Sequence, residues 1–325
     1  MANASRSIRS AYRSKAVVDW LVLEIEVGRP TQFQWLQRTL ADHFGDHTRT
    51  YIEAIDAGAG NTATSFLVRL NDSCCRDGHT IRAALAALDR EYTLVGTVLI
   101  RSLEVSLDFY PKDVQARADL LTLVGRLQIS LEAANGISHR QVGPSKQPDF
   151  LDSTRKPDPE KTLYINNKAD PVSWRAYHKV TDRGQPLPHH DHRARVEFTL
   201  QDAGLHSYGI NSLNDLVEHG FDKFAHLLHF RKFLPISTLL AGKAPSVACA
   251  LRHATRHVRN TIALYPFGRY AYYRDNRTGY PRNGGRPKQR KHSTHTESDD
   301  ELNHLARDRL HDLTKNFHTK LEAKN

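Results

Sequence analysis

Three short segments alternate between apolar side chains and polar or ionisable ones, and this alternation constrains the fold more than any other feature of the chain. The segments are Ile100–Asp108, Trp174–Lys179 and Arg193–Leu200. Successive side chains of a β-strand point to opposite faces of a sheet, so each segment predicts a strand with one apolar face and one reactive face. Such strands are half-buried, and we expect one side of their sheet to stay open.

The reactive face of these strands brings together several kinds of ionisable and nucleophilic group. Its members are Glu104, Ser106 and Asp108, then Arg175, Tyr177 and Lys179, and finally Arg193, Arg195, Glu197 and Thr199. A solvated outer face would alternate in the same way. Carboxylates on two strands with a tyrosine and a lysine on the third favour a catalytic surface instead.

The order of elements up to Asp108 predicts an α+β fold. Apolar spacing and turn residues indicate strand, helix, two strands, helix and strand. This βαββαβ order is typical of an open antiparallel, ferredoxin-like sheet with helices on one face. The expected segments are a strand at Val17–Val27, a helix from Pro30 to Phe44, strands at Tyr51–Asp56 and Ser65–Leu70, a helix through Ile81–Leu88 and the strand with Glu104 and Asp108.

The rest of the chain predicts a continuation of this sheet followed by helices. The expected segments are a helix at Ala116–Ala134, further strands between Thr162 and Leu200, and helices at Leu213–Phe230 and Ile236–Leu264. The predicted regions are a disordered basic N-terminus (1–16), a catalytic domain (17–235), a helical extension (236–270), a flexible basic linker (271–298) and a C-terminal amphipathic helix (299–322). The apolar stripe of the last helix fits either docking on its own chain or pairing of two copies.

Positive charge is concentrated near the C-terminus. The chain has 46 lysines and arginines against 36 acids, a formal net charge of +10, and residues 251–292 hold eleven of these cations against one acid, Asp275. Tyrosines alternate with arginines there, and such a surface suits phosphates and unstacked bases. We therefore expect a nucleic acid as partner, with contacts from Arg269, Arg274, Arg277, Arg286, Lys288, Arg290 and Lys291.

Cysteine usage and hydropathy exclude two other classes of protein. The cysteines are Cys74, Cys75 and Cys249, and their spacing matches neither a disulfide framework nor a zinc motif. No apolar run approaches the length of a membrane span. We expect a cytoplasmic protein without a membrane partner.

A series of motifs resembles one known family. The motifs are Val18-Asp-Trp-Leu21, Arg101-x-x-Glu-x-x-x-Asp108, Thr162-Leu-Tyr-Ile165, Arg175-x-Tyr-x-Lys179 and Arg195-x-Glu-x-x-Leu200. Over roughly residues 17–235 their order and spacing resemble the Rep_trans-type initiators of rolling-circle plasmid replication, with relatives among phage replication initiation factors and conjugative relaxases.

The resemblance implies a bacterial enzyme that nicks one strand at a plasmid or phage origin, at a single-stranded or hairpin site, and rejoins it. Tyr177 would attack the phosphate with help from Lys179, leaving a 5′-phosphotyrosine and a free 3′ hydroxyl for a host polymerase and helicase. Glu104, Asp108 and Glu197 would hold a divalent cation, and hard oxygen ligands favour Mg²⁺ or Mn²⁺. Arg175, Arg193 and Arg195 would contact DNA.

Several alternatives stay open at this level. Tyr164, near Lys168, is a rival nucleophile, and Glu24 or Glu26 is a further metal ligand to consider. The histidines around Asp191, which are His189, His190 and His192, read as an exposed hairpin loop rather than a metal site. A conjugative relaxase has the same chemistry, and a non-enzymatic DNA-binding regulator of copy number would need only the basic segment.

Overall fold

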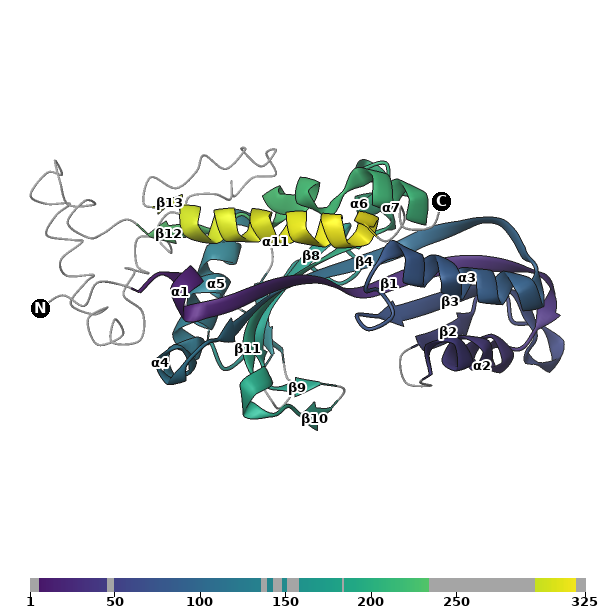
Figure 1. Ribbon diagram of the computed structural model, residues 1–325, viewed down its shortest axis with the longest axis horizontal. Coiled ribbons are helices and arrows are strands. Elements are labelled where there is room, and N and C mark those ends of the chain that lie inside the picture. Colours follow the sequence, from purple (N-terminus) through teal and green to yellow (C-terminus); the bar gives the residue numbers. More distant parts are fainter. Residues whose placement is uncertain are drawn as a thin grey trace, which may run out of the picture.

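The centre of the molecule is a nine-stranded antiparallel sheet in the order β2-β3-β1-β4-β11-β8-β7-β5-β6 (Figure 1). The computed structural model describes residues 6–45, 50–135, 139–142, 148–150, 158–182, 184–233 and 296–319. The sheet strands are β1 Tyr12–Thr31, β2 Thr50–Ala54, β3 Ala63–Asn71, β4 Leu94–Pro111, β5 His139–Val142, β6 Pro148–Phe150, β7 Thr162–Ile165, β8 Val172–Lys179 and β11 Arg193–Gln201.

The remaining elements are short hairpins and helices. Two hairpins pair β9 Thr181–Asp182 with β10 Gln185–Pro186, and β12 Arg231–Phe233 with β13 Thr296–Ser298. The α-helices are α1 Ile8–Ala11, α2 Phe33–Phe44, α3 Gly78–Tyr92, α4 Val114–Ala118, α5 Leu120–Asn135, α6 Asp202–Ser207, α7 Leu213–His219 and α11 Asp300–Thr319. The 3-10 helices are η1 Ala59–Asn61, η2 His189–Asp191 and η3 Phe221–Leu228.

The predicted α+β fold class is confirmed. Elements β1 to β4 with α2 and α3 follow the expected βαββαβ order, and their strands lie in the order β2-β3-β1-β4. This is the arrangement of a ferredoxin-like sheet. Strand β11 continues the sheet beyond β4, and β8 and β7 follow it.

Helices cover the apolar face of this sheet, as the alternation predicted. On β4 the side chains of Leu103, Val105, Leu107 and Phe109 are fully buried. Helix α5 packs against β8 and β11, and α11 packs against β1 and η3. Figure 1 shows the β9–β10 hairpin on the side of the sheet opposite to α11.

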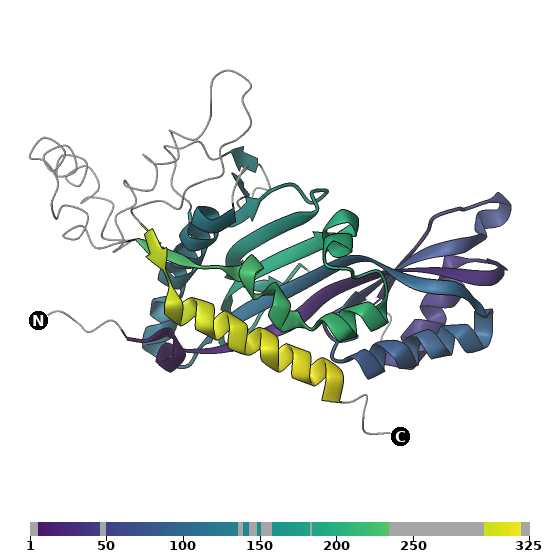
Figure 2. The same ribbon diagram turned by 90° about the horizontal axis from the view of Figure 1, so that it is seen from above.

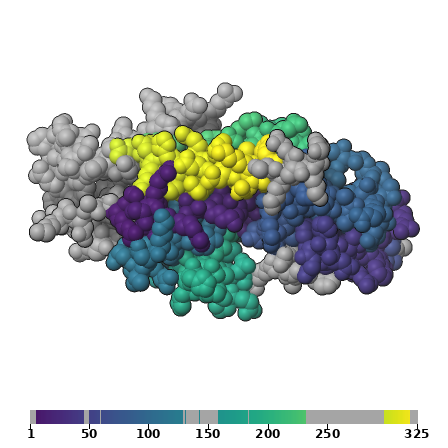
Figure 3. Space-filling view, viewed as in Figure 1, coloured from purple at the N-terminus to yellow at the C-terminus, as the bar shows by residue number. Residues whose placement is uncertain are grey.

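The predicted C-terminal helix, α11, docks on its own chain. It runs beside the first part of β1 and past η3, which is visible in Figures 2 and 3. Hydrogen bonds fix its position: Glu301 accepts from the backbone N–H of Ile8 at 2.6 Å, and Thr314 accepts from that of Phe221 at 2.8 Å. The buried apolar residues of α11 are Leu302, Leu305, Ala306, Leu310, Leu313 and Phe317.

Some predicted boundaries are wrong. Residues 8–16, expected to be disordered, form α1 and the start of β1, because Ile8 and Tyr12 are buried and the Tyr12 hydroxyl donates to the carbonyl of Ala116 at 2.9 Å. The helix expected at Leu213–Phe230 is interrupted at Gly220, where φ is +74°. Residues 296–298, expected in the linker, form β13.

The other regional predictions fall mostly outside the described residues. These are the helical extension at 236–270 and the basic linker up to residue 295, together with every cation predicted there to contact nucleic acid. In the described ranges no helix combines the length and apolarity that a membrane span requires.

Candidate active site

The strand register places the predicted reactive side chains in cross-strand rows on the face opposite to the apolar one, which we call the open face. Along β11 this face is buried as well, in contrast to the half-buried strand expected. Glu197 on β11 lies opposite Ser106 of β4 and Arg175 of β8. In the neighbouring row Arg195 lies opposite Asp108 and Tyr177. Residues paired in this way share a face of the sheet, so the parity argument from sequence is confirmed for these three strands.

A β-bulge on β1 adds a carboxylate to this face. Val18 pairs with Val105 and Trp20 with Glu104, so Asp19 is the extra residue between two regular pairs. A bulge of this kind redirects a side chain, and Asp19 points to the open face, where it accepts from Arg195 at 2.8 Å.

Three carboxylates from three strands meet at this point. Asp19, Glu104 and Glu197 each offer an oxygen, and these three oxygens lie within 4.8 Å of one another. Glu197 is completely buried and Asp19 nearly so. We call these three residues the acidic cluster.

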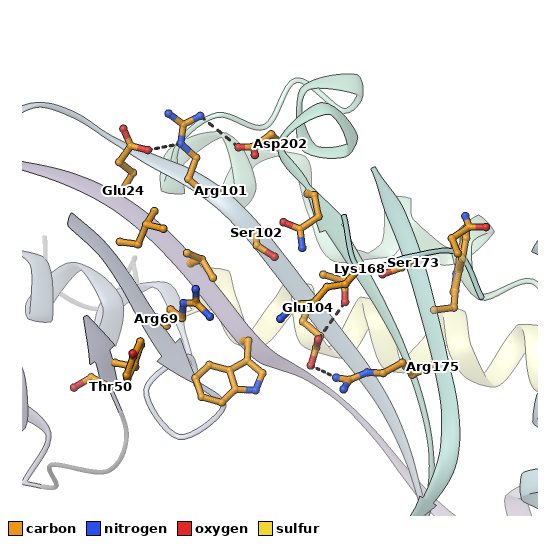
Figure 4. A pocket seen from close by; sticks show the side chains of 18 of the residues that line it. Glu24, Thr50, Arg69, Arg101, Ser102, Glu104, Lys168, Ser173, Arg175 and Asp202 are labelled. Atoms are coloured by element: carbon orange, nitrogen blue, oxygen red, sulfur yellow. Dashed lines mark hydrogen bonds and ion pairs between the residues drawn. The ribbon is translucent and has the colours of Figure 1, made fainter. Parts of the chain in front are cut away.

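Arg175 bridges two members of the acidic cluster. Its Nη2 donates to Oε1 of Glu104 at 2.7 Å (Figure 4). Its Nε lies 2.6 Å from Oε2 of Glu197. The side chain of Arg175 is one-third exposed. This guanidinium therefore lies between the carboxylates and the solvent.

Arg195 and Asp108 form a buried ion pair in the cross-strand row next to the cluster. Nε and Nη2 of Arg195 donate to the two oxygens of Asp108 at 2.6 and 2.7 Å, and Arg193 lies 3.2 Å from Oδ2 of Asp108. Only 1% of the Arg195 side chain is exposed. Asp108 therefore lies outside the acidic cluster, where Asp19 takes its predicted place.

The same burial revises the predicted roles of two arginines. Arg195 also donates to Asp19 and Glu197, so its guanidinium is paired with carboxylates inside the protein. Its side chain exposes too little surface to contact a DNA phosphate. Arg193 is 8% exposed and donates to the carbonyl of Asp191. Both arginines hold the site together rather than present an open cation.

Burial and mutual repulsion perturb the acidic cluster. Burial, followed by the charge of Glu197, raises the pKa of Glu104 to about 8. Burial opposes ionisation of Asp19 as well, but Arg195 and Lys179 outweigh it and hold the pKa of Asp19 below its ordinary value. Glu104 therefore ionises less readily than Asp19.

The predicted nucleophile Tyr177 touches the cluster. Its hydroxyl donates to Oε1 of Glu197 at 2.8 Å. Burial, followed by the charge of Glu197, raises the pKa of Tyr177 well above its ordinary value. Lys179 forms an ion pair with Asp182 at 2.8 Å, and the cations that favour ionisation of Tyr177 are Arg195 and Arg175.

The rival tyrosine, Tyr164, lies one strand further along, opposite Arg175. It lines a groove of about 1240 Å³ that crosses the open face and also contains Glu104, Arg175 and Lys168. Figure 4 shows Thr50 and Arg69 on one side of this groove and Lys168 and Arg175 on the other.

Other predicted candidates lie away from the acidic cluster. Glu24 accepts from Arg101 at 2.6 Å, and Glu26 is exposed. His189 and His190 are exposed in η2, in agreement with a loop rather than a metal site. Among the described residues, the acidic cluster is the one group of acids, histidines and cysteines with metal-binding spacing.

Sequence reasoning missed Asp19 although the motif Val18–Leu21 contains it. The alternation rule assigns one face to each residue and breaks down at a bulge. The available signal was a carboxylate next to an aromatic residue inside an otherwise apolar strand.

Comparisons with known proteins give structural likenesses, one of which has low identity and a low TM-score. No family model and no curated protein matches the chain. Among solved structures, a rolling circle replication initiator protein from Geobacillus stearothermophilus matches with 16% identity and a TM-score of 0.31. The match covers 60% of this chain and 77% of that one.

Proposed function

We propose that this protein is a replication initiator that nicks and rejoins one DNA strand through a tyrosine, in a reaction that depends on a divalent cation. The observation that carries the proposal is the contact between Tyr177 and the acidic cluster on the open face of the sheet. A nucleophile within hydrogen-bond reach of a base, with the base held by a third group, is the arrangement that activates hydroxyl nucleophiles. Glu197 is that base, and Arg175 and Arg195 hold it.

The acidic cluster fits a hard divalent cation such as Mg²⁺ or Mn²⁺. Its three carboxylates converge within 4.8 Å, and the positive charge that balances them here comes from Arg175 and Arg195. Oε2 of Glu197 is buried, and its close partner is Nε of Arg175 at 2.6 Å, so a bound cation would share this oxygen with Arg175 or displace it. Asp19, Glu104 and Glu197 are the proposed ligands, and a cation held there would polarise the scissile phosphate.

The chain's own residues account for the transfer step. The oxygen of Tyr177 bonds to phosphorus while the bond from phosphorus to the 3′ oxygen breaks. Glu197 takes the proton of the tyrosine, and the departing 3′ oxygen takes a proton from solvent. One phosphodiester bond replaces another, so no nucleotide cofactor is required, and the reverse step rejoins the strand.

Tyr164 is the alternative nucleophile because it lines the groove, whereas Tyr177 is largely buried. In both cases Arg175 is the cation placed to meet the phosphate, since it lies between the two tyrosines and is one-third exposed. The proposed substrate is an origin with an unpaired nick site, and the proposed partners are a host helicase and polymerase. The chemistry fits a conjugative relaxase equally well.

A nicking assay tests the proposal. Supercoiled plasmid carrying the protein's own origin is incubated with Mg²⁺ or Mn²⁺, and nicked circles are counted. We expect Glu197→Gln to lower the rate by roughly a hundred-fold or more, because it removes both a ligand and the base. Glu26→Gln, an exposed acid on β1, is the matched control and should nick normally. A wild-type protein that binds DNA and never nicks would favour a DNA-binding regulator instead.

A further inference from the structure

The groove across the open face exposes aromatic rings that the proposed strand transfer does not use. Trp20 on β1 is 39% exposed and Tyr51 on β2 is 57% exposed, and both line the groove. Large aromatic side chains on an open sheet face are a feature of proteins that stack unpaired bases.

Trp20 lies directly beside the acidic cluster. It is the cross-strand partner of Glu104, because the bulge at Asp19 turns both Asp19 and Trp20 to the open face. Side chains paired in this way have Cβ atoms about 5 Å apart. The ring of Trp20 would therefore lie next to the phosphate that the cluster would hold, where the adjacent base could stack on it.

Tyr51 lies further along the groove and has a cation above its ring. Arg69 is its cross-strand partner, and the guanidinium carbon lies 5.7 Å from the ring centroid. Two strand spacings of about 4.8 Å and two residues of about 3.4 Å separate Tyr51 from Trp20, or roughly 12 Å. Stacked bases follow one another at about 3.4 Å, so an extended strand, rather than a stacked duplex, matches this spacing.

Cations line the same groove. Arg69, Arg101, Lys168 and Arg175 face three acids, which are Glu24, Glu104 and Asp202. Arg101 is paired with Glu24 and Asp202, and Arg69 with Glu53 at 3.1 Å in an exposed ion pair. Lys168 is exposed and has no ion pair within the described ranges. Groove walls that combine aromatic rings with available cations suit bases and phosphates together.

We propose that this groove binds the unpaired nucleotides next to the scissile phosphate, with Trp20 and Tyr51 as base-stacking surfaces and Arg69 and Lys168 as phosphate contacts. The inference rests on the proposed function in taking DNA as the ligand and the acidic cluster as the place of the reacting phosphate. It assigns Trp20 the base adjacent to the reacting phosphate and Tyr51 a base further along the strand.

The test measures binding without cleavage. Fluorescence anisotropy of a labelled oligothymidine is recorded with the full chain in EDTA at moderate salt. Trp20→Ala and Tyr51→Ala should each weaken binding by roughly five- to a hundred-fold, and Trp20→Phe should restore most of it. Trp35→Ala is the matched control, because Trp35 is 51% exposed on α2 and does not line the groove. All variants should keep the wild-type melting temperature.

An abasic oligonucleotide separates stacking from a general loss of affinity. In wild type, removal of a single base from the oligonucleotide should weaken binding. At the position whose base stacks on Trp20, the same removal should not weaken binding to Trp20→Ala any further. Equal losses in wild type and variant at every position would overturn the proposal, as would wild-type affinity in both alanine variants. Conversion of a dimer into a monomer by Trp20→Ala would assign the groove to a second copy of the chain.

The assays distinguish failure of one proposal from failure of the other. If the protein binds oligothymidine through Trp20 and Tyr51 but never nicks its origin, the groove proposal is supported and the enzymatic function is contradicted. If the protein nicks its origin while both alanine variants bind normally, the function is supported and the groove proposal is contradicted.

Discussion

Glu104 and Asp108 lie four residues apart on one strand and have opposite environments. Both oxygens of Asp108 accept from Arg195, whereas Glu104 is buried next to Glu197 with Arg175 as its cation. The alternation of β4 predicted that both would face the same way. It did not distinguish a ligand from a structural ion pair, because that depends on the residue opposite on β11, which is Arg195 for Asp108 and Thr199 for Glu104.

Glu104 predicts an unusual dependence of stability on pH. Its pKa is about 8 in the folded protein and near 4.5 in the unfolded chain, so the folded state binds the extra proton between these values. The free energy of unfolding should therefore fall as the pH rises from about 5 to 8, by up to about 1.4 kcal/mol per pH unit.

Urea unfolding in EDTA measures this dependence. Glu104→Gln keeps the shape of the side chain and removes its titration, so the difference between wild type and variant isolates the contribution of Glu104. A difference that does not change between pH 5 and 8 would contradict the shift.

At the scale of elements, regular periodicity predicted most of the fold, and interruptions account for the errors. The stripe of α11 and the strands β4, β8 and β11 follow their periods and lie where expected. The bulge that presents Asp19 breaks the period of two, and sequence alone gives no register for it. An apolar stripe also does not specify what it packs against. The sequence is therefore equally compatible with docking of α11 on its own chain and with pairing of two copies. Whether the protein forms a homodimer stays a prediction.

The docking of α11 predicts a stability contribution from its buried face. Leu310 is fully buried, so Leu310→Ala should lower the free energy of unfolding by about 2–5 kcal/mol. His311→Ala, at the exposed neighbouring position, should change it by less than about 0.5 kcal/mol. Denaturant titration of both variants checks this, and equal stabilities would show that α11 contributes little to the fold in solution.

On the scale of the whole molecule, charge is divided between two regions of the sequence. Residues 251–292 carry the entire formal excess of +10, so the remainder of the chain is neutral in sum. Positive charge of this density provides affinity for any nucleic acid. Under the proposed function, the groove would select the strand and the acidic cluster would act on it.

This division predicts that the basic segment affects DNA binding differently from the groove. Replacing Arg286, Lys288, Arg290 and Lys291 by glutamine should weaken binding to every DNA sequence and reduce the slope of log affinity against log salt by roughly three to four. The matched control replaces four exposed arginines of the described fold, Arg76, Arg90, Arg117 and Arg307. An equal change of slope in both variants would contradict a specific role for the basic segment.

The most direct test of the account identifies the tyrosine that becomes attached to DNA. The protein is incubated with Mn²⁺ and a single-stranded oligonucleotide from its own origin, digested with protease, and the peptide that carries the nucleotide is sequenced by mass spectrometry. We predict that Tyr177 carries the 5′-phosphate of the cleaved strand, and that this covalent peptide is absent in EDTA and in Glu197→Gln. Attachment to Tyr164 would contradict the assigned nucleophile, and the absence of any covalent peptide under every divalent cation would contradict strand transfer itself.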